Sequence, residues 1–165
     1  MLPWPRRVAA DRLARGLATL SLWLVASTVH AGDVRVDLLG EAAMSRLTHV
    51  TCTVSPPGSG AQKQFLLVQG PACKPGGGAC PHVALMKVDR RTVSFTRVTE
   101  PHQLANGTWT SAFKQGDRTL SIDMAPRPPG VTPSDSDGQY DAILTLGDGK
   151  GHSTKVKGVA GCGED

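Results

Sequence analysis

Apolar and polar residues alternate along short stretches of the chain, which is the pattern of strands with one buried face. Val34, Val36 and Leu38, for example, are separated by Arg35 and Asp37. Because no helical pattern separates these stretches, we expect the strands to pair antiparallel. The sequence therefore predicts an all-β fold, a small antiparallel β-sandwich or barrel of about eight or nine short strands. The nine candidate strands lie at 34–38, 50–54, 65–68, 82–88, 91–98, 109–113, 120–124, 140–146 and 156–159.

Turn residues separate the candidate strands. The segments 147–150 (GDGK) and 114–117 (KQGD) predict tight hairpins, because glycine adopts a positive φ without steric cost. The Asp89-Arg90 pair predicts a further turn, and Asn106-Gly107 is a turn signal that also begins a glycosylation sequon. Outside the first 31 residues, only 40–46 has helical character.

The first 31 residues have the organisation of a secretory signal peptide. Four arginines precede an apolar stretch at 16–29, and Val29-His30-Ala31 supplies a cleavage site with small residues. An uncleaved anchor is the alternative, but the stretch between Arg15 and Asp33 is shorter than the roughly 18 apolar residues a span needs. We therefore expect cleavage after Ala31, a periplasmic or secreted protein without a membrane span, and one β domain at 32–165.

Removal of the leader changes the charge of the chain. The leader contains four of the 18 Lys and Arg residues and one of the 14 Asp and Glu residues, so 32–165 has a net charge of about +1. The five remaining aromatic residues are scattered rather than interleaved with basic residues. Nucleic-acid binding is therefore not expected.

All four cysteines follow the leader, and an even number in an oxidising compartment predicts disulfides. Three pairings are possible. We favour Cys73–Cys80, because CKPGGGAC has a proline and three glycines that turn the chain back, and this leaves Cys52–Cys162. The spacings match no zinc site.

Three long connections interrupt the strand rhythm, at 55–62, 70–81 and 125–138. Loops of this size are either flexible or functional, and binding residues concentrate on loops carried by rigid sheets. Prolines reduce the entropy that such a loop loses when it docks. We therefore predict a contact surface formed by Pro126, Arg127, Pro128, Pro129 and Val131, together with Pro56 and Pro57.

Motifs for catalysis and metal binding are weak. Ser111 and Lys114 have the S-x-x-K spacing of penicillin-binding enzymes, but in a strand they point to opposite faces. Cys80, His82 and Met86 resemble the copper-binding loop of blue copper proteins, at narrower spacing.

Because Cys80 is assigned to a disulfide, we expect Met86 to pack in a strand and His82 to cap a turn. His82, Met86 and His49 stay open as alternative copper ligands. The acidic run at 135–141 has calcium-like composition, but a turn with exposed aspartates is the preferred interpretation.

The sequence thus favours a non-catalytic binding module without a cofactor, which contacts another envelope or secreted protein through its Pro/Gly-rich loops. One alternative is a periplasmic inhibitor or immunity protein of a hydrolase. Another is a fibre or adhesin subunit, because 32–39 (GDVRVDLL) alternates as a donor strand would. A periplasmic copper-binding protein is the last. The sequence predicts neither the partner nor the oligomeric state.

Overall fold

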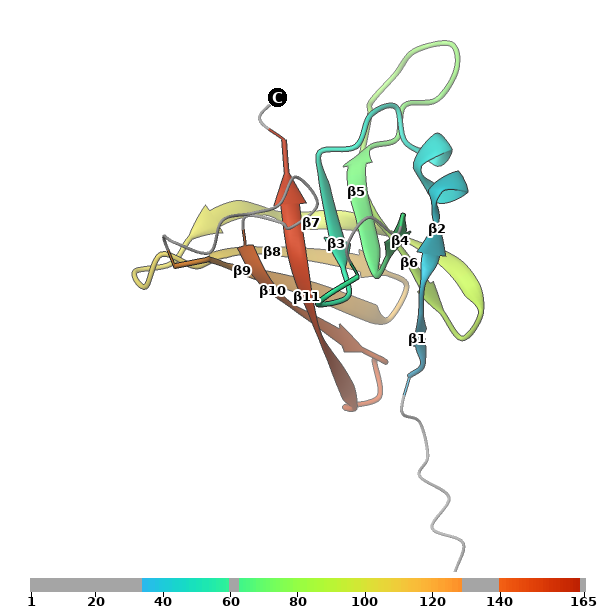
Figure 1. Cartoon of the computed structure of the whole chain (residues 1–165). Helices are drawn as coiled ribbons and strands as arrows, with labels where there is room; N and C mark the ends of the chain where they lie inside the picture. The colour runs from blue at the N-terminus through green and yellow to red at the C-terminus, as the bar shows by residue number, and fades with distance from the viewer. Residues whose placement is uncertain (1–33, 60–62, 129–139, 164–165) are drawn as a thin grey trace, which may run out of the picture.

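The fold was analysed in a computed structural model, which describes residues 34–59, 63–128 and 140–163. The structure is all-β, as predicted (Figure 1). The predicted leader lies outside the described residues. In chain order the elements are β1 (Val36–Asp37), β2 (Leu39–Gly40), the 3₁₀ helix η1 (Glu41–Arg46), β3 (Cys52–Ser55), β4 (Gln64–Phe65), β5 (Leu67–Pro71), β6 (His82–Val88), β7 (Arg91–Gln103), β8 (Trp109–Gln115), β9 (Arg118–Pro126), β10 (Tyr140–Gly147) and β11 (Ser153–Cys162).

Eight strands form a closed antiparallel barrel, which decides between the two predicted architectures. The strands β3, β5, β6, β7, β8, β9, β10 and β11 each pair with the next one in this series, and β11 pairs with β3. Closure leaves these strands without a free long edge. The remaining strands are accessory: β1 pairs with the end of β6, and β2 pairs with β4.

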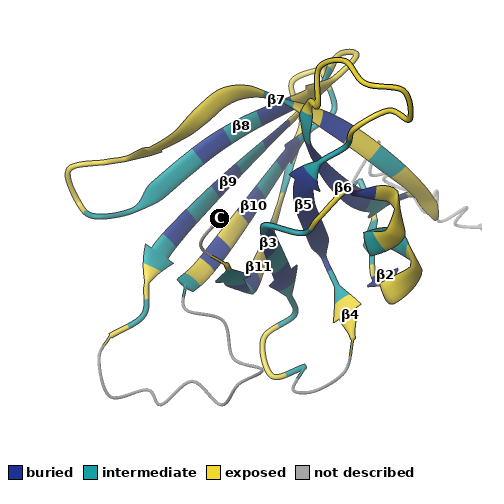
Figure 2. Cartoon of the chain, turned by 90° about the horizontal axis from the view of Figure 1, so that it is seen from above, coloured by how far each residue is buried: buried dark blue, intermediate teal, exposed yellow. Residues whose placement is uncertain are grey.

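The barrel interior is filled by the apolar members of the alternating stretches. Phe95, Phe113, Leu120 and Leu144 are at most 1% exposed and belong to one continuous cluster. Full burial of such a side chain contributes about 1.5–3 kcal/mol, so this cluster is the main source of stability. The polar residues of the same strands alternate to the outside, as Figure 2 shows by the banding along β9 and β10.

A second apolar cluster lies outside the barrel wall. Val68, Val83 and Leu85 point outward from β5 and β6 and pack with Leu39 and Leu47, which flank η1. This cover explains why both strands are apolar almost throughout: they are buried on both faces. The helical character expected at 40–46 is confirmed, because η1 spans Glu41–Arg46.

The predicted hairpins are present, although some boundaries differ. Asp89 and Arg90 both adopt positive φ, 50° and 65°, as a two-residue hairpin turn requires. The stretch 34–38 is not one strand, since pairing breaks at Leu38, whose side chain is 37% exposed. Strand pairing also continues to Pro71 and Pro126, so the connections after β5 and β9 begin later than the pattern indicated.

Both favoured disulfides are confirmed. Cys52 and Cys162 are directly opposite each other on β3 and β11, and Cys73 is bonded to Cys80 in the β5–β6 connection. No helix among the described residues is long and apolar enough to cross a membrane.

Candidate binding site

The two ends of the barrel have different connections. At one end, here the open end, lie the β5–β6, β7–β8 and β9–β10 connections, of which β5–β6 and β9–β10 are longer than the hairpin turns at the other end. At the other, here the hairpin end, lie the short turns between β6 and β7, β8 and β9, and β10 and β11. In Figure 2 the β5–β6 connection and the tip of the β7–β8 hairpin are exposed.

A cavity of about 240 Å³ occupies the open end. Each of the eight barrel strands contributes at least one lining residue, so the cavity is the unfilled end of the barrel interior. Its apolar wall consists of Pro101, Trp109, Met124, Tyr140 and the Cys52–Cys162 disulfide. Its polar lining residues are Thr51, Gln69, His82, Arg97 and Ser111.

Two largely buried residues present polar side chains to this cavity. Gln69 is 8% exposed and Ser111 is 3% exposed. Among the described residues, neither the Gln69 amide nor the Ser111 hydroxyl forms a side-chain hydrogen bond, and both line the cavity. No fully buried side-chain N or O atom of the described residues lacks a hydrogen-bond partner, so these polar atoms are accessible from the cavity. The barrel therefore presents two hydrogen-bonding groups to whatever fills its open end.

A hydrogen-bond chain fixes His82 at the rim. The Thr51 hydroxyl donates to the Gln69 carbonyl oxygen at 3.2 Å and lies 3.1 Å from His82 Nε2. When the hydroxyl proton lies on the Gln69 carbonyl oxygen, Nε2 of His82 is the donor in the second contact. Gly70 permits this arrangement: a Cβ there would overlap the His49 carbonyl oxygen, where the segment before Thr51 crosses β5.

Arg97 supplies the permanent positive charge of the cavity. It pairs with the inward-facing Phe113 across β7 and β8, and its side chain is 20% exposed. Its Nη2 lies 3.0 Å and 2.8 Å from the two carboxylate oxygens of Glu100, whose side chain is 80% exposed. Glu100 follows in the irregular part of β7, where the register shifts.

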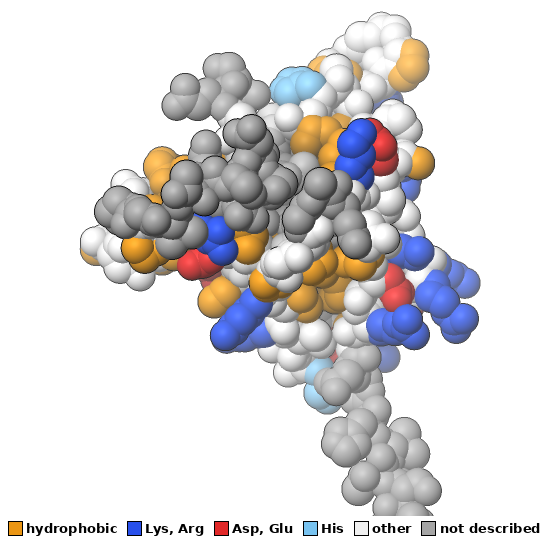
Figure 3. All heavy atoms as spheres, viewed as in Figure 1, with side chains coloured by type: hydrophobic (Ala, Val, Ile, Leu, Met, Phe, Trp, Pro, Cys, Tyr) orange, Lys and Arg blue, Asp and Glu red, His pale blue; other side chains and the backbone are white. Residues whose placement is uncertain are grey.

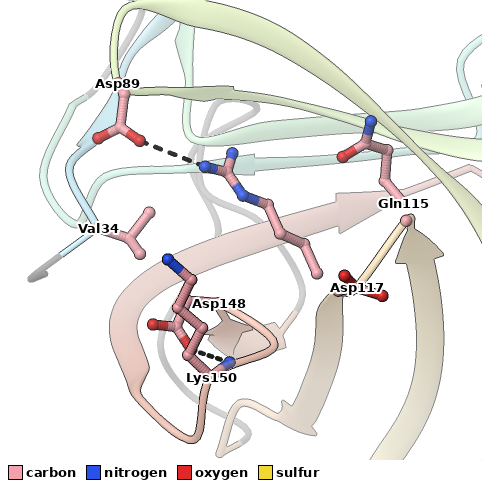
Figure 4. Close-up of a pocket in the computed structure, with 8 residues that line it drawn as sticks. Val34, Asp89, Gln115, Asp117, Asp148 and Lys150 are labelled. Carbon is pink, nitrogen blue, oxygen red and sulfur yellow. Dashed lines mark hydrogen bonds and ion pairs between the residues drawn. The ribbon is translucent and has the colours of Figure 1, made fainter.

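The hairpin end carries a wider cavity of about 490 Å³ with charged walls (Figure 4). Here the less exposed carboxylate, Asp148, accepts hydrogen bonds from the backbone N–H groups of Lys150 and His152, and its other oxygen lies 2.8 Å from His152 Nδ1. The His152 contact, with these backbone bonds, lowers the pKa of Asp148 to about 2. The β10–β11 turn itself therefore supplies the hydrogen-bond partners of the Asp148 carboxylate.

Ion pairs continue around the hairpin end. Asp89 lies 3.7 Å from Arg118, and Asp37 pairs with the Arg35 side chain and accepts the backbone N–H of Arg90. The hydrogen bond from Arg90 holds the pKa of Asp37 below its usual value. Figure 3 shows Lys and Arg side chains gathered at the lower right, over β1 and the β6–β7 turn.

The predicted binding loop lies only partly among the described residues. Pro129 and Val131 are outside them. Pro126 and Pro128 are exposed at the open end, whereas Arg127 pairs with Asp141 at 2.9 Å, so its charge is partly used on the barrel wall.

The predicted turn with Pro56 and Pro57 starts from the same row of paired residues as the segment that follows β9. Ser55, just before Pro56 and Pro57, stands opposite Val159, which stands opposite Asp141 and through it Ala125. The two segments thus start about 14 Å apart, three strand spacings. The connections themselves leave their strands in opposite directions.

The copper candidates do not converge. His82 and Met86 are four residues apart in β6, about 13 Å along a strand, and Met86 is fully buried in the core. His49 is exposed on the segment that crosses β5. Within the described ranges, no group of three His, Cys, Asp or Glu residues lies close enough to hold a metal ion.

The S-x-x-K spacing does not bring the Ser111 and Lys114 side chains together. Ser111 points into the barrel and Lys114 is exposed, as the strand period predicts.

The sequence interpretation missed the cavity. A usable signal was present: Gln69, His82, Arg97 and Ser111 are polar residues in phase with the buried residues of their strands. Each is unremarkable alone, and only the barrel register brings them together.

Comparison with known proteins gives no relative. No protein-family model, curated protein or solved structure matches the chain.

Proposed function

We propose that the protein is an exported, non-catalytic binding module that contacts a partner protein with the open end of its barrel. The observation that carries this proposal is the cavity, where the polar side chains of Gln69 and Ser111 are accessible and form no hydrogen bond with the other described residues. The β5–β6 and β7–β8 connections and the start of the proline-rich β9–β10 connection lie at the same end. The two disulfides, which fit an oxidising compartment, both lie at this end.

Rigidity supports this proposal. Disulfides and a closed sheet hold the rim in place before binding, so little ordering entropy is lost when a partner docks. A hydrolase inhibitor or immunity protein would be one form of such a module. Its partner would insert a side chain or chain end into the cavity.

Site-specific photocrosslinking tests the proposal. Leu104 and Ile143 are both large, apolar and similarly exposed, at 43% and 40%, but Leu104 lies at the open end and Ile143 on the outer wall of β10. We expect a photoreactive phenylalanine at 104 to capture an envelope protein and the same group at 143 to capture none. Equal capture at both positions, or capture at 143 alone, would contradict the proposal.

Deletion of 127–134 tests the role of the proline-rich segment. We expect the melting temperature to change little, because this segment follows the last residue of β9, and capture at 104 to be lost. Undiminished capture would remove the segment from the contact surface.

A further inference from the structure

The described lining of the cavity at the open end has one sign of charge. Among these described lining residues, Arg97 is the permanent cation, and there is no Asp or Glu. A partly buried guanidinium needs an anion or several acceptors to offset its lost hydration. Its five N–H donors form a planar fork that matches a carboxylate. The lining thus selects for an acidic group at this point.

Glu100 now occupies the place of such a group. Both of its oxygens lie within 3.0 Å of Arg97 Nη2, yet its side chain is 80% exposed. Exposed ion pairs contribute little, since solvent screens them and the long side chains lose entropy. Glu100 can therefore be displaced by a carboxylate that is held by further contacts inside the cavity.

Those further contacts are present. Trp109, Tyr140 and Met124 offer apolar and aromatic surface, and Ser111 and Gln69 offer unpaired polar atoms. The volume of about 240 Å³ limits the occupant to a body of about one aromatic side chain. A plain inorganic anion would leave the apolar wall uncovered.

We propose that the cavity binds a carboxylate on an apolar stem, which replaces Glu100 on Arg97. This inference rests on the open end being the binding face. The same chemistry has two sources: a free small acid, or a partner chain that ends in an apolar residue with a free carboxylate. Ser111 and Gln69 then pair with the polar atoms nearest the carboxylate.

The test uses the full chain and four probes. These are 3-phenylpropionate, its neutral analogue 3-phenylpropanamide, and a short peptide ending in Phe with either a free or an amidated terminus. Affinity is measured by calorimetry, and the location by the NMR shift of the Trp109 indole N–H. We expect each acid to bind about tenfold or more tightly than its amide, as for a charge-assisted hydrogen bond.

Variants assign the effect to residues. Arg97→Gln should reduce acid binding about tenfold, to the level of the amide, and leave amide binding unchanged. Glu100→Gln should increase acid binding by roughly threefold, because a competing anion is removed. Glu41→Gln, which breaks the exposed Lys63–Glu41 pair on η1, is the matched control and should change nothing.

Several outcomes overturn the inference: equal binding of acid and amide, no shift at Trp109, or weaker acid binding in Glu100→Gln. If Arg97→Gln fails to fold, the Glu100→Gln variant and the comparison of each acid with its amide still test the inference. Tighter binding of the peptide acid than of phenylpropionate identifies a chain end as the source, and the reverse identifies a small acid. Failure here with crosslinking intact at 104 would leave the proposed function standing.

Discussion

The two ends of the barrel satisfy their polar groups in different ways. At the hairpin end, short turns provide the partners: Asp148 accepts two backbone N–H groups and contacts His152 within one five-residue turn. At the open end, Gln69 and Ser111 are more deeply buried and have no side-chain hydrogen bond among the described residues. The turn at the hairpin end thus satisfies Asp148, whereas Gln69 and Ser111 at the open end have hydrogen-bonding capacity that the described residues do not use.

The ends also differ in how their backbone is held. The hairpin end relies on local turn geometry, whereas the open end has long connections and both disulfides. Covalent links can hold a rim rigid without filling it with side chains. This contrast makes the two ends respond differently to substitution.

Removal of the Cys52–Cys162 bond should have the largest effect. This bond closes a segment with a sequence separation of 110, whereas Cys73 and Cys80 are separated by seven. In the chain-entropy model the free energy of unfolding falls by about 5 kcal/mol for the long link and about 2.5 kcal/mol for the short one. Urea unfolding of the Cys52→Ser/Cys162→Ser and Cys73→Ser/Cys80→Ser double variants measures both.

The ratio of the two losses is the diagnostic result. Equal losses would mean that chain closure is not how the long disulfide stabilises the barrel. Intact-mass measurement of the unreduced wild type is the control, and four free thiols would remove the premise of the comparison.

Substitution of Gly70 should destabilise the open end by about 1–3 kcal/mol. A Cβ there meets backbone, which cannot move aside as a flexible side chain can. Gly149→Ala should have a similar effect at the hairpin end, because its φ is +77° and its Cβ would lie 2.6 Å from the Asp117 carbonyl oxygen. Thermal unfolding measures both variants.

The two glycine variants should differ in binding. Only Gly70→Ala displaces the segment that carries Thr51 and the His82 contact, so only it should weaken ligand binding at the open end. Gly40→Ala, with no atom within 4 Å of the added Cβ, is the control. Loss of binding in Gly149→Ala would show that the ends are coupled.

The fold followed from sequence because its signals are local. Strand alternation, the GDGK and KQGD turns and the CKPGGGAC loop each require only neighbouring residues. The end of β1 at Asp37 and the start of β2 at Leu39 were not predictable, since they depend on pairing with β6 and β4, far along the chain.

The cavity was not predictable for the same reason. Arg97 and Ser111 become neighbours only through the register of β7 with β8, and Gln69 joins them through closure of the barrel. A polar residue at a strand position where the alternation calls for an apolar one marks a candidate lining residue. The alternation does not show which of these residues are neighbours in the fold. The proline-rich segment predicted as a contact surface starts at the same end of the barrel as the cavity, but it was selected by its composition and not by the residues that line the cavity.

Ser111→Ala should leave stability unchanged or raise it by up to about 1 kcal/mol. The hydroxyl lines the cavity and forms no side-chain hydrogen bond among the described residues, so its removal breaks no such bond. The same variant should weaken acid binding, which is the signature of a group kept for function. Ser121→Ala, on the outer face of β9, should change neither quantity. A clear loss of stability in Ser111→Ala would mean that the hydroxyl is structural.

Asp148→Asn should lower the stability above about pH 4 and have little effect near pH 2. The pKa of Asp148 is lowered to about 2 in the folded protein from 3.8, so the unfolded chain binds the proton more tightly. Its stabilising effect is therefore present above about pH 4 and is lost as the pH falls towards 2. Urea midpoints between pH 5 and 2 should decline less in Asp148→Asn than in the wild type. Parallel declines would place the acid sensitivity elsewhere.

The bond between Cys52 and Cys162 joins the first barrel strand to the last, so the eight-stranded body is a covalent hoop. A single peptide cleavage in an exposed connection, such as 104–106, would open the hoop without releasing a fragment. New chain ends placed at such a point should therefore be tolerated, and a single proteolytic cleavage there would not by itself dismantle the protein.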